Sequence, residues 1–144
     1  MGASIDVKRD EDCKAKIVVD RGNRALDEEP VSWAERAQGL GAGEIFFNSV
    51  DHDGARKGYD LESIRAITKA VDVPLIAFGG VFTWSHLLAG IEAGAEAVAA
   101  ANIFHYTEQA TRKAKSFLAN AGVAVRSEGQ NLPQAAPLPS RAAS

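Results

Sequence analysis

The chain has 144 residues, a net charge of −3 and 46% hydrophobic residues, which suits one domain with a sizeable core. The slightly negative charge argues against binding to nucleic acid, because neutralising phosphates needs a basic surface. The chain has one cysteine, Cys13, a start without a signal sequence, and no apolar run of the roughly 20 residues that span a membrane, so we expect a cytoplasmic protein without disulfides or membrane contact.

The first 43 residues predict a strand, a short β segment and a helix. The strand covers residues 3–7, and the second β segment covers residues 16–20. Pro30 suits the first turn of a helix, and apolar residues three apart follow it until Gly39 and Gly41 end the helix.

The middle of the chain predicts two strands separated by a helix. Ile and Phe residues mark a buried strand at 44–49, which a polar loop follows at 50–59. Asp60 suits the N-cap of a helix with an apolar face, over residues 61–71. The next strand covers residues 75–78.

The remaining elements complete a repeated strand–helix pattern. They are a helix capped by Thr83 or Ser85 that runs to Gly94, a strand at 97–101, a short turn at 103–106, and a helix from Thr107 to about Asn120. Strands separated by such helices imply right-handed crossovers and a parallel sheet. We count four βα units, which predicts an α/β fold equal to half of a (β/α)8 barrel, since a complete barrel needs roughly 200 to 250 residues.

The chain therefore divides into a predicted half-barrel over residues 1–126 and a tail over residues 127–144. The tail is rich in Pro, Ala, Ser and Gln, and this composition predicts disorder. A partner-binding tail is the alternative interpretation.

Acidic residues stand at the carboxyl ends of two predicted strands, where barrels of this kind carry their active sites. Asp6 ends the first strand and Asp51 follows the second. Two carboxylates beside a substrate suit proton transfer. For Asp51 the alternative is loop capping, because Asp-x-Asp-Gly is also common in turns. The same segment lacks the middle ligands of a calcium loop, and the histidines lack metal-site spacing, so we predict neither a metal site nor a cofactor.

Small residues follow the other two predicted strands. Gly79 and Gly80 end one, and Ala101 and Asn102 end the other before a short helix. Glycines let the backbone approach a ligand closely, and a helix N-terminus favours an anion. The pattern favours a phosphate site without Lys or Arg; the alternative is that the two glycines form only a tight turn.

Six short segments resemble a known family in one register between about Ser4 and Arg126. They are SIDVKR at 4–9, GAGEI at 41–45, NSVDHDG at 48–54, GYD at 58–60, PLIAFGGV at 74–81 and AAANIFHY at 99–106. They resemble the carboxyl-terminal half of the cyclase subunit of imidazole glycerol phosphate synthase.

The resemblance implies a lyase and cyclisation step of histidine biosynthesis. Ammonia from a glutaminase partner reacts with a bis-phosphorylated ribulosyl formimino carboxamide nucleotide, giving imidazole glycerol phosphate and an aminoimidazole carboxamide ribotide. Asp6 corresponds to one of two catalytic aspartates and would be the acid or base, and Asp51 would be an assisting or orienting carboxylate. The other aspartate belongs to a first strand that this chain lacks, so we expect the chain to need the missing amino-terminal half or to self-associate.

The resemblance also implies a set of substrate-binding residues. These are Asn48, Asp53, Gly54, Gly79, Gly80, Ala100, Ala101 and Asn102. Asn48 replaces the family's usual Thr, Asn102 its usual Ser, and Phe78 the usual Ser near the phosphate. Asn48 and the stretch at 30–34 resemble a paralogous branch that pairs with a glutaminase-like partner and forms amidines on surface nonulosonic sugars. A non-catalytic, phosphate-binding half-barrel is a third interpretation.

Overall fold

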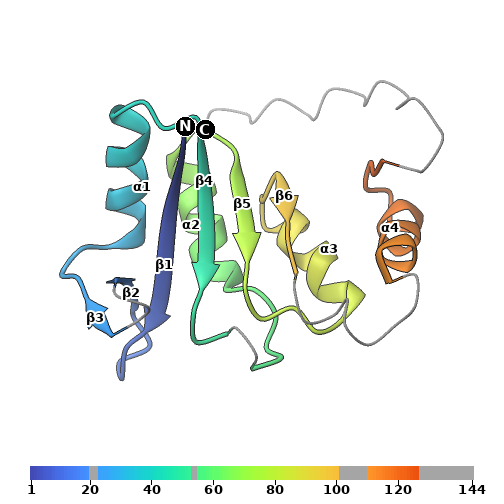
Figure 1. Cartoon of the computed structure of the whole chain (residues 1–144), viewed down its shortest axis with the longest axis horizontal. Coiled ribbons are helices and arrows are strands. Elements are labelled where there is room, and N and C mark those ends of the chain that lie inside the picture. The colour runs from blue at the N-terminus through green and yellow to red at the C-terminus, as the bar shows by residue number, and fades with distance from the viewer. Residues whose placement is uncertain (20–22, 53–54, 101–109, 127–144) are drawn as a thin grey trace.

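The computed structural model describes residues 1–19, 23–52, 55–100 and 110–126. The strands are β1 (Gly2–Arg9), β2 (Ala15–Val19), β3 (Arg24–Ala25), β4 (Glu44–Ser49), β5 (Leu75–Phe78) and β6 (Ala97–Val98), and the helices are α1 (Pro30–Gly39), α2 (Leu61–Ala70), α3 (Trp84–Glu92) and α4 (Ala110–Asn120) (Figure 1). The predicted tail and the turn at 103–106 lie outside these residues. Within the described ranges no helix is long and apolar enough to cross a membrane.

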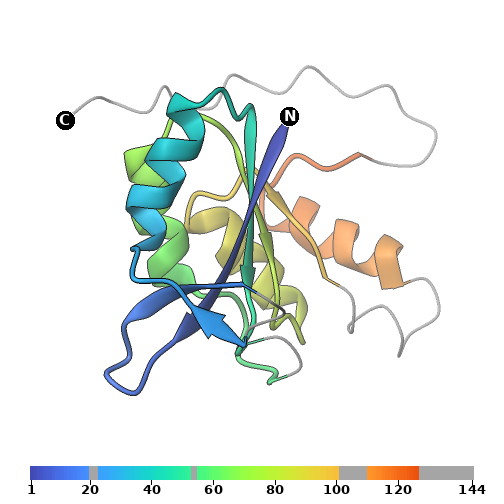
Figure 2. The ribbon, with the colours of Figure 1, turned by 60° about the vertical axis from the view of Figure 1, so that its left-hand side comes forward.

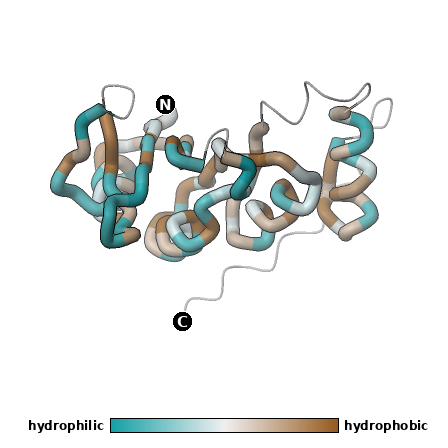
Figure 3. The backbone as a smooth tube through the Cα atoms, turned by 90° about the horizontal axis from the view of Figure 1, so that it is seen from below, coloured by the Kyte–Doolittle hydropathy of each residue, from teal (hydrophilic) through white to brown (hydrophobic). Residues whose placement is uncertain are grey.

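The strands form one sheet in the order β3-β2-β1-β4-β5-β6. β1, β4, β5 and β6 pair in parallel, and each is followed along the chain by a helix. β2 and β3 extend the sheet as antiparallel strands inside the first β-to-α connection. Seen from the carboxyl ends of the parallel strands, the elements form an open row from the β2–β3 segment to α4 (Figure 3). The predicted half-barrel of four βα units is confirmed.

The two faces of the parallel strands differ in what covers them. Alternate side chains pack in the core beneath the helices, and on β1, β4 and β5 these are Ile5, Val7, Ile45, Phe47, Leu75 and Ala77. Figure 2 shows α1 and α2 against this face. The opposite face carries the other side chains of the alternation, including Asp6, Asn48 and Phe78, which stay partly exposed. A closed barrel would enclose this second face, which we call the inner face.

Several predicted helix ends are confirmed. Pro30 opens α1, and the Asp60 carboxylate accepts the backbone N–H of Ser63 at 3.2 Å as the N-cap of α2. Gly122, with φ +88°, follows the end of α4. Thr83 is the N-cap of α3, but its hydroxyl lies 2.7 Å from the Ser85 hydroxyl and makes no capping bond to the backbone.

Two predicted strand ends were wrong. β1 continues through Lys8 and Arg9 because β2 pairs with this part of it, with Arg9 opposite Ala15. β6 ends at Val98 rather than at residue 101. The Ala99 amide still donates to β5, but its carbonyl accepts the Tyr59 hydroxyl at 2.8 Å in place of a strand donor.

Candidate functional site

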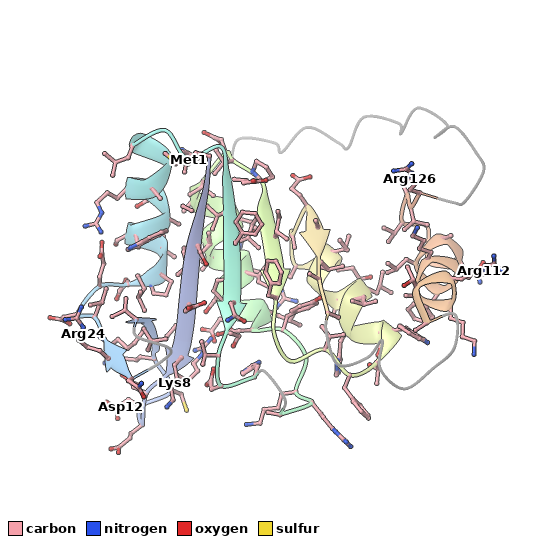
Figure 4. The ribbon with its side chains drawn as sticks, viewed as in Figure 1. Met1, Lys8, Asp12, Arg24, Arg112 and Arg126 are labelled. Carbon is pink, nitrogen blue, oxygen red and sulfur yellow. The ribbon has the colours of Figure 1, made fainter. Side chains whose placement is uncertain are left out.

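A pocket of about 460 Å³ opens on the inner face near the carboxyl ends of the parallel strands. In Figure 4, Lys8 marks this end of β1 and Met1 the opposite end. The lining residues are Ser4, Asp6, Phe46, Asn48, Phe78, Gly79, Gly80, Val81, Ala99 and Ala100. Five predicted site residues are therefore brought together: Asp6, Asn48, Gly79, Gly80 and Ala100.

Asp6 and Asn48 form the polar part of this pocket. They lie opposite each other in the parallel register of β1 and β4, and Phe78 of β5 lies opposite Asn48. The Asn48 side-chain amide donates to the Asp6 carboxylate at 3.1 Å. A carboxylate held beside a carboxamide offers a ligand both a proton acceptor and a hydrogen-bond donor.

Two aromatic rings form an apolar wall beside this polar pair. The ring centroids of Phe46 and Phe78 are 5.9 Å apart and the rings are tilted by 40°, an arrangement that aromatic pairs favour. Both rings line the pocket. The pocket therefore offers a ligand both a polar pair, an acid and an amide, and an apolar surface next to it.

The Gly79–Gly80 turn lines the pocket and also lies close to the backbone at Ser49 and Gly58. Gly79 and Gly80 both have positive φ angles, +91° and +86°. A Cβ on residue 79 would lie 2.7 Å from the Ser49 carbonyl, and one on residue 80 would press on the Gly58 carbonyl. The packing of the chain therefore requires both glycines, as the tight-turn interpretation expects, and a phosphate-binding role stays a prediction.

Replacing Gly80 by alanine should destabilise the chain far more than the same change at Gly41. Both residues have positive φ, which costs a side chain about 1–2 kcal/mol. A Cβ at Gly41 meets nothing within 4 Å, whereas one at Gly80 also meets backbone atoms. We expect Gly80→Ala to cost at least about 2 kcal/mol more than Gly41→Ala in urea unfolding. Equal costs would contradict this prediction and would show that the backbone near Gly58 can move away from the added methyl group.

Asp51, the second predicted catalytic carboxylate, does not line the pocket. One oxygen accepts the backbone N–H of Arg9 at 3.1 Å, and the other accepts the Ser49 hydroxyl at 3.3 Å. Asp53, Gly54, Ala101 and Asn102 lie outside the described residues. Within the described part of the chain, no three His, Cys, Asp or Glu side chains gather as metal ligands.

Comparison with known proteins identifies the family to which this chain belongs. Residues 1–110 match the family model described as "Histidine biosynthesis protein". The chain belongs to this family. It is 43% identical over 123 residues to imidazole glycerol phosphate synthase subunit HisF of Streptomyces coelicolor, which confirms the predicted resemblance. The alignment covers 85% of this chain and 49% of that protein, so the chain spans about half the length of this relative.

This member of the histidine biosynthesis family also has an ionic cluster that sequence reasoning missed. The Arg9 guanidinium binds both oxygens of Asp60, at 2.7 and 3.1 Å, and the Asp60 side chain is only 4% exposed. Arg9 also donates to Glu62 at 3.0 Å and to the Cys13 carbonyl at 2.7 Å. One signal was available, because Arg9 continues the alternation of the buried Ile5 and Val7.

The cluster changes the titration of both partners. Burial alone raises the pKa of Asp60, but hydrogen bonds from Arg9 and from the Ser63 amide and hydroxyl outweigh it and hold that pKa below its ordinary value. The hydrogen bond to Asp60 is the main cause that raises the pKa of Arg9. The pair therefore remains ionised at neutral pH and fixes the end of β1 to the start of α2.

Proposed function

We propose that this chain supplies the carboxyl-terminal half of a cyclase barrel that makes imidazole glycerol phosphate in histidine biosynthesis. The observation that carries the proposal is the pocket in which the hydrogen-bonded Asp6 and Asn48 face the Gly79–Gly80 turn. Its place at the carboxyl ends of parallel strands is where barrel enzymes carry their chemistry. The 43% identity to a HisF subunit supports the same conclusion.

The proposed roles follow from the chemistry of each group. Asp6 exchanges a proton with the reacting nitrogen as ammonia adds to the substrate and the ring closes. Asn48 orients the Asp6 carboxylate and donates to the ligand. The backbone at Gly79 and Gly80 binds a phosphate group, together with Ala100 and residues 101–102. A glutaminase subunit is the proposed source of ammonia.

The exposed edges of the sheet support the proposal that further βα units complete this site. Among the described residues, the pairing of β1 with β2 is confined to residues 7–9 of β1, so residues 2–6 of β1 have a strand neighbour on one side only. β6 likewise pairs only with β5. Unpaired edges beside a partly apolar face favour association. The proposed occupant is an amino-terminal half-barrel of the kind found in the HisF relative, with a second copy of the chain as the alternative.

A completion experiment tests this function. The chain is mixed with the amino-terminal half of the Streptomyces coelicolor relative, an ammonium salt and the bis-phosphorylated nucleotide. We expect imidazole glycerol phosphate to appear, by chromatography, from the mixture and from neither half alone. Light scattering after size exclusion reports whether the halves associate. A stable complex that leaves the nucleotide unchanged would contradict the proposed reaction.

One pocket residue favours a second candidate function, the formation of amidines on nonulosonic sugars. Asn48 lines the pocket, and together with the stretch at 30–34 it resembles the paralogous branch. Phe78 also lines the pocket and departs from the serine usual in the cyclase. Phe78 adds an apolar ring where a serine would offer a hydroxyl to phosphate. To test it, a nonulosonic sugar and ¹⁵N-labelled ammonium are added to the same mixture. Incorporation of ¹⁵N into the sugar, without turnover of the nucleotide, would favour this function. Either reaction suits the cytoplasm, the proposed location.

A further inference from the structure

Asp51 directs its carboxylate at the ends of two neighbouring strands. Its Oδ2 accepts the Arg9 backbone N–H at 3.1 Å, and its Oδ1 accepts the hydroxyl of Ser49 at 3.3 Å. Ser49 is completely buried, so its hydroxyl has a fixed partner. Both oxygens of Asp51 are thus used by the chain itself, and Asp51 is not among the residues that line the pocket.

The bond to Arg9 continues the ladder between β1 and β4. The Val50 N–H donates to the Val7 carbonyl at 2.9 Å, just beyond the last residue of β4. In a parallel ladder the next donor on β1 is the Arg9 N–H, which needs an acceptor from the neighbouring strand. Because β4 has ended, the Asp51 carboxylate supplies that acceptor through a charge-assisted hydrogen bond.

This link lies beside the proposed catalytic pair. Asp6 precedes Arg9 by three residues, and Asn48 precedes Asp51 by three residues, so the link closes the same two strands that carry the pair. Arg9 is itself fixed, because its guanidinium binds the buried Asp60 carboxylate. A strand end held at both its main chain and its side chain gives Asp51 a rigid attachment.

We propose that Asp51 is a positioning residue, which joins the ends of β1 and β4 so that Asp6 and Asn48 keep their hydrogen bond. This inference rests on the proposed function for its link to turnover, while its structural part stands alone. A general acid or base must come within hydrogen-bond reach of the proton that it moves. The two contacts of Asp51 hold it on the strand ends instead, which assigns proton transfer to Asp6.

Two substitutions separate positioning from proton transfer. In Asp51→Asn the amide oxygen can accept the Arg9 N–H, and the amide nitrogen can donate to the Ser49 hydroxyl oxygen, which also accepts. This variant keeps both contacts but cannot transfer a proton as a carboxylate does. Asp51→Ala removes the contacts as well. In the completed enzyme we expect Asp51→Asn to retain kcat within about 3-fold with an unchanged pH profile of kcat/KM, and Asp51→Ala to lose at least about 10-fold in kcat. A loss in Asp51→Asn as large as that in Asp51→Ala, or a changed pH profile of kcat/KM in Asp51→Asn, would overturn the proposal.

A second measurement on the full chain alone does not depend on turnover. The side-chain NH₂ resonances of Asn48 in ¹H–¹⁵N spectra report its bond to Asp6. We expect them to stay unchanged in Asp51→Asn and to shift and exchange faster in Asp51→Ala. Unchanged resonances in Asp51→Ala would overturn the positioning role, even if the completed enzyme proves inactive on the nucleotide.

A milder variant keeps the test valid if Asp51→Ala does not fold. Ser49→Ala removes one of the two contacts and leaves the Asp51 charge in place. We expect the Asn48 resonances to shift in the same direction as in Asp51→Ala, but less. No shift in Ser49→Ala would also count against the proposal.

Discussion

Replacing Asp6 by asparagine should lower the turnover of the completed enzyme by about 10²- to 10⁴-fold, the usual contribution of a general acid or base. Asparagine keeps the shape of the side chain, and its amide oxygen can still accept the bond from Asn48. What disappears is a group that takes up and returns a proton. Steady-state rates with saturating ammonium salt measure the loss, and isothermal titration with the nucleotide shows whether binding is kept.

The matched control for this prediction is Glu35→Gln. It makes the same change of carboxylate to amide at an exposed position on α1, away from the pocket. We expect its turnover to match the unchanged chain. If Asp6→Asn retained turnover within a few-fold of Glu35→Gln, another group would have to move the proton.

Local sequence patterns predicted the parallel strands that carry the pocket. The bounds of β4 and β5 were predicted without error, because each is a short run rich in apolar residues that begins after Gly or Pro; a polar loop follows β4 and a Gly-Gly pair follows β5. Asp60 was identified as a cap from its place before an amphipathic helix. The rule that parallel strands bring their carboxyl ends to one edge placed Asp6 at the site, whereas Asn48, which binds it, was predicted from the family resemblance.

What sequence patterns missed are contacts between residues distant in the chain. Arg9 and Asp60 are 51 positions apart, and nothing local to either residue indicates the other. The Ala99 carbonyl, just beyond the end of β6, accepts the hydroxyl of Tyr59, which lies 40 positions away in the chain. For Asp51 the sequence allowed both catalysis and loop capping. The choice depends on where the carboxylate points. It points at the Arg9 N–H at the end of β1, a contact between residues 42 positions apart in the chain.

The ion pair between Arg9 and Asp60 is the most buried of the ion pairs observed among the described residues, and we expect it to contribute the most of them to stability. Removing one partner of a buried pair leaves an uncompensated charge and costs about 3–5 kcal/mol. Asp60 is 4% exposed and Arg9 22% exposed, so we expect Arg9→Ala to cost about 3 kcal/mol. Alanine keeps the backbone N–H that Asp51 accepts, so urea unfolding of this variant measures the loss of the Arg9 side chain and not the loss of that link.

The same substitution at Arg36 provides the comparison. Arg36 makes a single contact of 3.0 Å to Glu28, and its side chain is 60% exposed. Exposed pairs contribute about 0–1 kcal/mol, because water already solvates both charges. We therefore expect Arg36→Ala to cost less than about 1 kcal/mol. Similar losses in the two variants would mean that the Asp60 carboxylate regains solvent when Arg9 is truncated.

The pH dependence of this difference identifies the carboxylate as its source. Because the pKa of Asp60 in the folded chain lies below its ordinary value of about 3.9, the unfolded chain binds the proton more readily. The stabilisation is therefore complete above the ordinary pKa and is lost as pH falls through the lower folded-state pKa. We expect the gap in unfolding free energy between the unchanged chain and Arg9→Ala to be constant near pH 7 and to narrow below about pH 4. A gap that does not change with pH would assign the loss to packing of the arginine side chain rather than to its charge.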